Sequence, residues 1–389
     1  MKKSEVFFII RSFILWRVAL FFVAYLAIYF IPIFGASFPY YDRVLEITHL
    51  PNWIWGFGNF DGVHYLRIAQ DGYVAAFSQA FFPLFPLLIR TIASFIPKNA
   101  MLDTAIYTDP AFFYSGLVLA NSIFLAALFV FYKLIRLDFT KLEAKRSIVF
   151  LLVFPTSFYF GSVYTESLFL LFTVASIYFV RKRSFILSGV FVSLATLTRI
   201  FGALLIIVYL IEVVRNKSKN KFLPALGLMI APLGILAYTL YLKANFGDPL
   251  YFLTVQPMFG AERSSGQIIL LPQVMYRYLK IFLATNISTL PFWNAMLEAL
   301  FTIVPLVILV LFLKKMRFSY WFFCVSALIL PTLTGTFSSM PRYALMAFLM
   351  IPYLANIVRN KKNFFILASI LGVLAVILTT LFIRGYWVA

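Results

Sequence analysis

Long apolar runs separated by short polar segments extend over almost the whole chain of 389 residues. A helix needs about 20 apolar residues to cross a bilayer, whereas a membrane β-barrel would show alternating segments of about ten residues. The pattern therefore predicts an all-α polytopic membrane protein with about 11 transmembrane helices, plus or minus two. The expected spans are residues 13–33, 111–132, 147–160, 164–180, 185–198, 201–214, 222–242, 296–313, 319–337, 343–358 and 364–383.

The basic residues predict the orientation of these spans. Most of the 33 lysines and arginines lie near the N-terminus and in the loops 133–146, 181–183, 215–221, 314–317 and 359–362. Loops rich in lysine and arginine stay in the cytosol. We therefore expect a multi-pass protein of the cell membrane with a cytoplasmic N-terminus and an active site on the extracytoplasmic face. The formal charge of +19 is then a topology signal, and no nucleic-acid partner is expected.

We find no internal repeat, and we treat residues 1–389 as a single membrane domain. Two polar stretches, 34–110 and 244–295, are expected to form extracytoplasmic elements. The apolar segment 81–97 contains prolines and an arginine, so we interpret it as a re-entrant or interfacial helix rather than a span. The polar residues of the second element, among them Asp248, Gln256 and Arg263, are either ordinary loop residues or part of an acceptor groove.

The first element contains the most informative polar segment. If residues 61–71 form a helix, Asp61, His64, Arg67 and Asp71 lie on one side, and Val63, Tyr65, Leu66 and Ala69 lie on the other. This is the pattern of an interfacial amphipathic helix whose ionisable groups face a cavity or water. The alternative is a helix whose charges are only solvated.

Three further charged residues are candidates for ligand binding. Glu166 is expected at the start of a helix, where it either caps the helix or binds a hydroxyl or cation. Arg199 and Arg342 are expected at the outer tips of helical hairpins. A guanidinium binds phosphate with two parallel hydrogen bonds, so this pair suggests an anionic lipid head group. The alternative for each arginine is snorkelling to the membrane surface.

Several chemistries are disfavoured by what the sequence lacks. It has one cysteine and two histidines, so a thiol or multi-histidine metal site is not expected, and the involvement of a divalent metal stays open. There is no P-loop and no dinucleotide fingerprint. An activated donor would therefore have to come from the membrane.

Taken in order, the polar motifs resemble those of PIG-V-type mannosyltransferases and their bacterial relatives. In eukaryotes this family adds the second mannose of GPI anchors. The composition, rich in Ile, Phe and Lys, suggests a bacterial member. The motifs are DGVHYLRIA at 61–69, FFPLFPL at 81–87, FP at 154–155, YTESL at 164–168, LATLTR at 194–199, FGDP at 246–249 and MPRY at 340–343.

The resemblance implies a glycosyltransferase-C (GT-C) fold and an inverting transfer of a sugar, most likely mannose in this family, from a polyprenyl-phosphate donor. It implies that Asp61 is the catalytic base and that the acceptor is a glycan, a lipid or a protein. The residues that it implies for substrate binding are His64, Tyr65, Arg67, Glu166, Arg199, Arg342 and Tyr343. Membrane lipids are the remaining partners.

Two other readings stay open at this point. A transporter or flippase for a phosphorylated lipid or glycolipid would place polar residues at mid-bilayer and relate its two halves by symmetry. A non-catalytic membrane scaffold would have no need of clustered external acids.

Overall fold

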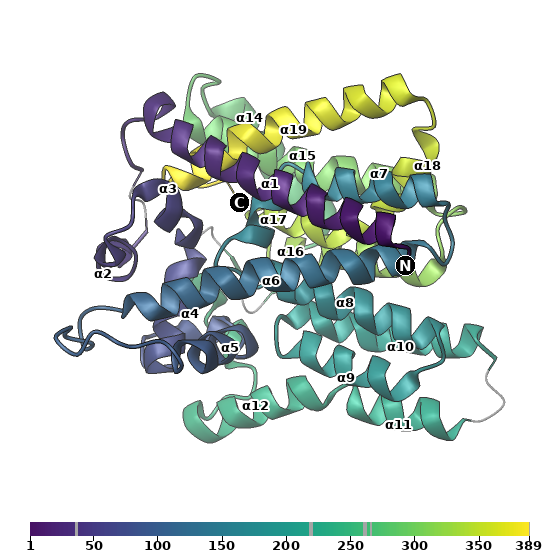
Figure 1. Ribbon diagram of the computed structural model, residues 1–389, viewed down its shortest axis with the longest axis horizontal. Coiled ribbons are helices and arrows are strands. Elements are labelled where there is room, and N and C mark those ends of the chain that lie inside the picture. Colours follow the sequence, from purple (N-terminus) through teal and green to yellow (C-terminus); the bar gives the residue numbers. More distant parts are fainter. Residues whose placement is uncertain (36–37, 218–220, 260–262, 265–266, 389) are drawn as a thin grey trace.

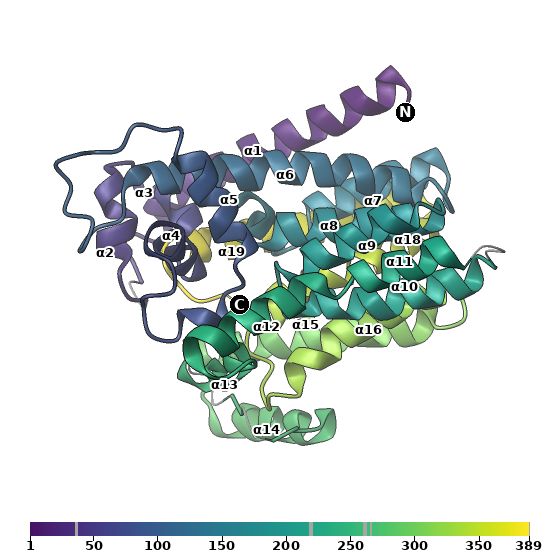
Figure 2. The same cartoon turned by 90° about the horizontal axis from the view of Figure 1, so that it is seen from below.

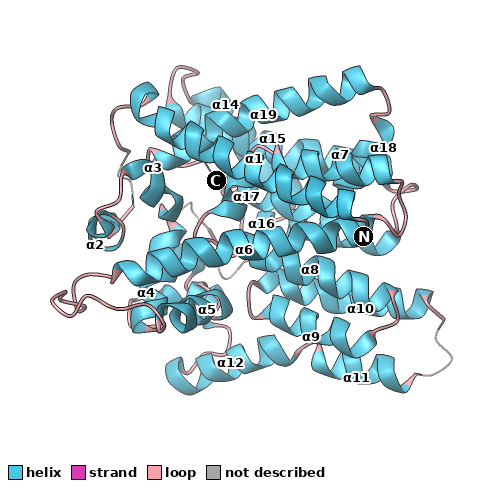
Figure 3. Ribbon diagram, in the orientation of Figure 1, coloured by secondary structure: helices cyan, strands magenta, loops and turns pink. Residues whose placement is uncertain are grey.

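A computed structural model describes residues 1–388, apart from residues 36–37, 218–220, 260–262 and 265–266. Both predicted external elements and the basic loop 215–221 therefore include residues outside the description. Within the described part, every regular element is a helix (Figure 3). The prediction of an all-α protein is confirmed.

Within the described residues, five helical stretches are long and apolar enough to cross a membrane. They overlap the predicted spans 13–33, 111–132, 222–242, 296–313 and 364–383, whereas the total of about eleven crossings stays a prediction. The five stretches are α1 (Lys3–Phe30), α6 (Pro110–Ile135), α11 (Phe222–Ile230) followed by α12 (Leu233–Phe246), α15 (Leu290–Phe312) and α19 (Lys361–Ile383).

Irregular backbone interrupts several predicted spans, of which 147–160 and 343–358 bear most on the site. Span 147–160 is broken after α7 (Lys141–Leu152) by a turn that contains Pro155, and η4 (Ser157–Gly161) follows. Span 343–358 is divided between the 3-10 helix η7 (Ala344–Met350) and α18 (Ile351–Ile357). Irregular backbone at membrane depth is tolerated where protein surrounds it, and all seven residues of η7 are buried.

The remaining helices of the bundle are shorter. Most of them run along the long axis of the molecule beside α1, α6 and α19 (Figure 1). These shorter helices are α8 (Glu166–Arg181), α9 (Phe185–Thr196), η5 (Ile200–Ala203), α10 (Leu204–Arg215), α16 (Phe318–Thr332) and α17 (Met340–Tyr343).

Small residues allow some of these helices to approach closely. A Cβ atom on Gly189 of α9 would lie only 2.2 Å from the carbonyl oxygen of Gly227 in α11. Lipid tails are as apolar as the helix surfaces, so helices in a membrane associate through such close packing.

The first predicted external element lies at the end of the molecule opposite the N-terminus (Figure 1). It contains α2 (Tyr41–Val44), η1 (Glu46–Thr48), α3 (Asn52–Trp55), η2 (Gly56–Gly58), α4 (Asp61–Asp71), η3 (Ser78–Ala80) and α5 (Leu84–Ala93). With its ten residues, α5 rises about 15 Å, half of the ~30 Å hydrocarbon core. This length favours the re-entrant interpretation of the segment 81–97.

The second predicted external element contains α13 (Tyr251–Thr254), η6 (Gln256–Phe259) and α14 (Leu271–Ala284). Figure 2 shows α13 and α14 at one edge of the molecule, outside the layers formed by the long helices. The arginine of α14, Arg277, donates a hydrogen bond of 3.0 Å to the carbonyl oxygen of Gly335 in the segment between α16 and α17. The second element is thereby attached to the segment that leads to Arg342.

Candidate functional site

The helix α4 has the amphipathic form that the sequence predicts. It begins at Asp61 and ends at Asp71, where Gly72 takes a positive φ of 81°. Its apolar side is buried, including Val63, Tyr65, Leu66 and Ala69. The predicted helix 61–71 and its buried apolar side are confirmed, whereas its place in the membrane interface stays a prediction; Asp61 lies at the N-terminal end of the helix.

The residue before Asp61 has an uncommon backbone conformation. Phe60 has φ 58° and ψ −118°, a region that residues other than glycine seldom occupy. Its ring packs against those of Phe382 and Trp387, with centroid distances of 5.8 and 5.2 Å. Strained backbone persists where the surroundings hold it firmly, and it gathers at functional sites.

Asn59 attaches this turn to the end of α19. Its side chain is fully buried, and Nδ2 donates hydrogen bonds to the carbonyl oxygens of Phe382 (2.7 Å) and Ile383 (3.2 Å). The hydroxyl of Tyr164 donates a bond of 2.8 Å to the carbonyl oxygen of Asn59. The position of Asp61 therefore depends on segments far away in the sequence.

Four charged side chains form a continuous chain of ion pairs at the start of α4. Arg342 of α17 contacts an Asp61 oxygen through Nη1 and Glu166 Oε1 through Nε. Arg199, which precedes η5, donates to the same Oε1 of Glu166 through Nη1. Glu166 is the first residue of α8, as predicted. Three of the predicted substrate-binding residues are thus gathered around the predicted base.

The four groups differ in their exposure. The side chains of Arg342, Glu166 and Arg199 are 7, 3 and 10% exposed, whereas that of Asp61 is 26% exposed. Charges that are removed from water need partners of opposite sign, and here two carboxylates balance two guanidiniums. The two arginines are therefore buried and paired rather than free at the surface, so snorkelling does not describe them.

Glu166 has one acceptor that this chain leaves unused. Its Oε2 is buried and has no hydrogen-bond partner among the described residues. Glu166 and Arg199 line a small cavity together with Phe160, Phe169 and Met346. Its volume of about 10 Å³ is enough for roughly one water molecule. A bound water or a ligand hydroxyl would satisfy Oε2.

The charges around Asp61 keep it ionised. Burial is the largest single influence and favours its neutral form, but the charge and hydrogen bond of Arg342, together with the charge of Arg263, outweigh burial and lower the pKa of Asp61 below its usual value. Burial also lowers the pKa of His64, although the charge of Asp61 opposes this shift. His64 is therefore neutral at physiological pH. Burial raises the pKa of Tyr65 to about 12, which keeps its hydroxyl protonated.

Aromatic rings surround the arginines and the histidine. The guanidinium of Arg342 lies 4.6 Å from the ring centroid of Tyr164, and that of Arg199 lies 5.7 Å from that of Tyr343. The imidazole of His64 stacks on the ring of Phe81 at 4.8 Å. Such faces stabilise the two buried guanidiniums.

Arg67 is not brought to this cluster. Its Nη2 lies 3.2 Å from Asp71 Oδ2, and its Nη1 donates to the carbonyl oxygen of Ile106 at 3.1 Å. The ion pair lies within α4, and the hydrogen bond to Ile106 holds α4 against the segment before α6. The geometry gives Arg67 a structural role at the far end of α4.

Sequence reasoning did not single out two residues around the site. Asn59 adjoins the DGVHYLRIA motif but has no charge to attract attention. Glu298 is the one ionisable residue in the apolar sequence of α15. An isolated acid in an apolar helix indicates a functional site, so sequence reasoning could have found it.

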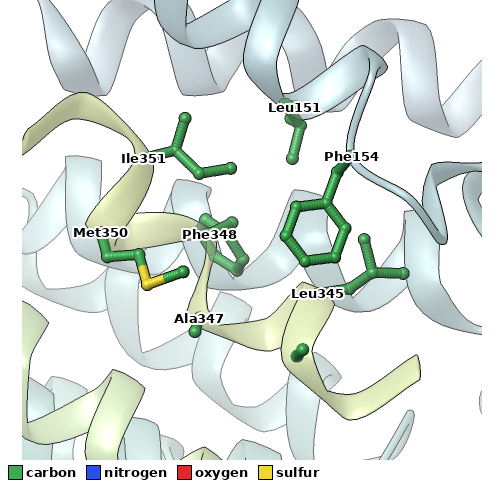
Figure 4. A pocket seen from close by; sticks show the side chains of 8 residues that line it. Leu151, Phe154, Leu345, Ala347, Phe348, Met350 and Ile351 are labelled. Atoms are coloured by element: carbon green, nitrogen blue, oxygen red, sulfur yellow. The ribbon is translucent and has the colours of Figure 1, made fainter. Parts of the chain in front are cut away.

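A separate cavity near the site is apolar (Figure 4). It lies between the end of α7 and η7, and Leu151, Phe154, Phe348 and Ile351 are among its lining residues. Only apolar residues line it, so it offers no polar group for catalysis.

The sequence matches the family described as Mannosyltransferase (PIG-V) over residues 8–227. No curated protein matches the chain. The matched region contains Asp61, Glu166 and Arg199, whereas Arg342 lies beyond it and reaches these residues only through the fold. Because the match covers more than half of the sequence, the chain belongs to the PIG-V mannosyltransferase family of membrane glycosyltransferases.

Proposed function

We propose that this protein is an inverting GT-C enzyme. It transfers a sugar, most likely mannose, from a polyprenyl-phosphate donor to an acceptor hydroxyl on the extracytoplasmic side of the membrane. The observation that carries the proposal is the ion-pair chain, in which a partly exposed carboxylate, Asp61, lies beside two buried arginines at the end of a membrane bundle. The carboxylate of Asp61 can accept the proton of the acceptor hydroxyl, and the two guanidiniums can bind the leaving phosphate.

Asp61 is the proposed general base. In the reaction the acceptor oxygen bonds to C1 of the sugar, its proton passes to Asp61, and the bond between C1 and the phosphate oxygen breaks. The phosphate leaves with the electron pair. Asp61 is ionised and 26% exposed, so an acceptor hydroxyl can approach it. His64 is neutral and lies near Asp61, where it is placed to contact the sugar.

Arg342 and Arg199 are the proposed partners of the donor phosphate. Fixed cations that stabilise developing charge are often the largest contribution to catalysis. Arg342 uses Nε for Glu166 and Nη1 for Asp61, and in this proposal the donor phosphate draws the guanidinium away from Asp61. Loss of that pairing raises the pKa of Asp61 and makes it a stronger base. The base is then activated only when the donor is in place.

The test is sugar transfer by the purified full-length protein in detergent. The donor is polyprenyl-phosphate mannose, and the readout is release of polyprenyl phosphate. Asp61→Asn should abolish release with little change in melting temperature. The matched control is Asp71→Asn, the same chemical change at the other end of α4, and it should keep turnover.

Two results would refute this assignment. Turnover in Asp61→Asn equal to that of the wild type would remove Asp61 from the base role. If the wild type releases no polyprenyl phosphate from any polyprenyl-phosphate sugar, the transferase proposal fails. The alternative of a lipid transporter or flippase would then be favoured.

A further inference from the structure

An acid lies within the apolar helix α15, outside the ion-pair chain. Glu298 interrupts a helix that is otherwise suited to span the membrane. Such a residue is costly in an apolar setting, and it usually marks a functional site whose partner can be identified. The side chain of Glu298 is only partly buried, so a ligand can reach it.

The partner of Glu298 is Tyr278 of α14. The Tyr278 hydroxyl donates to Glu298 Oε2, and it accepts a hydrogen bond of 3.1 Å from the backbone N–H of Phe337. It also lies 3.3 Å from Oγ1 of Thr336. These contacts orient one carboxylate oxygen of Glu298. The other carboxylate oxygen of Glu298, Oε1, is not a buried atom left without a hydrogen-bond partner.

A short segment connects this pair to the catalytic base. Residues 336–337 contact Tyr278, and Ser339 Oγ lies 3.2 Å from Nη2 of Arg263. One helical turn later, Arg342 contacts Asp61. Arg263 contacts Ser339, which lies two residues after Phe337 and three before Arg342, so Arg263 adjoins the segment that joins Tyr278 to the partner of Asp61.

We propose that Glu298, Tyr278 and Arg263 form a subsite for a hydroxyl-rich acceptor, that is, a sugar-containing molecule. This proposal rests on the proposed function, because it assigns the acceptor side of the same reaction. A carboxylate accepts hydrogen bonds from neighbouring hydroxyls, and a guanidinium donates to sugar oxygens. The subsite would present one acceptor hydroxyl to Asp61 while it holds the others.

A single isolated anion or cation fits the three side chains less well than a sugar does. A phosphate at Arg263 would be repelled by Glu298, and a metal ion at Glu298 would be repelled by Arg263. A ligand with both donors and acceptors suits such a mixed set. Sugar hydroxyls provide both on each oxygen.

The experiment measures sugar binding and donor cleavage separately. Saturation-transfer NMR titrations with methyl α-mannoside and methyl α-glucoside give Kd values for the detergent-purified full-length protein. Glu298→Gln should weaken binding of the preferred glycoside at least about tenfold, as expected for loss of a charged hydrogen-bond partner. Tyr278→Phe should weaken it less. The matched control is Tyr276→Phe, because Tyr276 lies exposed on the same helix and should leave Kd unchanged.

Cleavage of polyprenyl-phosphate mannose by water, without acceptor, is the second measurement. It should stay at the wild-type rate in Glu298→Gln, because the variant changes only the acceptor side. Equal loss of cleavage and glycoside binding would overturn the proposal, since it would indicate damage to the fold. The subsite is also refuted if Glu298→Gln binds the glycosides as the wild type does, or if the wild type binds neither.

The two proposals fail in different ways. A wild type that binds a glycoside but cleaves no polyprenyl-phosphate sugar would keep the subsite and refute the transferase. A wild type that cleaves the donor but binds neither glycoside would refute the subsite alone.

Discussion

Glu166→Gln should destabilise the protein strongly although it changes a single atom of the side chain. Glu166 is 4% exposed, and its Oε1 accepts from both Arg342 and Arg199. The amide keeps the shape but removes the charge that balances two buried guanidiniums. Arg342 retains Asp61 as a partner, whereas Arg199 has no other acid among the ion pairs of the described residues.

The magnitude follows from the burial of the two sites. Removal of one partner from a buried ion pair costs about 3–5 kcal/mol, so Glu166→Gln should lose about that much. Asp61 is 26% exposed at its side chain, and Arg342 keeps Glu166 when Asp61 is neutralised. Asp61→Asn should therefore cost about 1 kcal/mol or less. Each of the two variants thus replaces one carboxylate partner of Arg342 by the corresponding amide.

The assay is the melting temperature of both variants in one detergent. For a chain of this size, 1 kcal/mol corresponds to roughly 2 °C or less, so Glu166→Gln should melt up to about 10 °C below the wild type. Asp61→Asn should stay within about 2 °C. Equal melting temperatures for Glu166→Gln and the wild type would refute the argument that Glu166 compensates buried charge.

Three further predictions follow from other contacts. Arg263→Gln removes one of the cations that lower the pKa of Asp61. The fall of kcat/KM on the acid side of its pH profile should therefore move to higher pH. A profile measured between pH 3 and 8 in which this fall does not move would contradict the prediction. Because the folded pKa is depressed, the ion pair stabilises the protein above about pH 4 and ceases to do so as the pH falls further. Asn59→Ala removes the side-chain donor from two carbonyl oxygens at the end of α19, of which that of Phe382 keeps the backbone N–H of Gly385. It should cost about 1–3 kcal/mol and lower kcat more than it changes KM, and an unchanged kcat would argue against a positioning role. Gly189→Ala would place a Cβ 2.2 Å from a backbone oxygen of α11, whereas a Cβ at Gly372 of α19 meets nothing within 4 Å. Only Gly189→Ala should therefore lower the melting temperature. Equal shifts in Gly189→Ala and Gly372→Ala would contradict the close-packing argument.

The sequence alone predicted features that depend on local pattern. Apolar runs indicated the all-α membrane class, because composition and length decide whether a helix suits the bilayer. The limits and buried side of α4 were also predictable, since helix periodicity decides which residues share a side. Gly72, just after Asp71, is a residue type that readily ends a helix.

The continuity of the spans was decided by the fold. Residues 147–160 and 343–358 are apolar, but each contains a break in the helix. An apolar segment has the same composition whether it crosses lipid or lies as irregular backbone inside the protein. Hydropathy therefore cannot separate the two cases, and only the packing around η4 and η7 does.

The partners of the proposed catalytic carboxylate, Asp61, were also decided by the tertiary structure. Arg67 is close to Asp61 in the sequence, yet it pairs with Asp71, while Arg342 reaches Asp61 across 281 residues. Coulomb attraction depends on distance in space and on the surrounding dielectric, not on distance along the chain. Residue types and motifs could therefore name Asp61, Glu166, Arg199 and Arg342 as candidates, but only the folded bundle could bring them together.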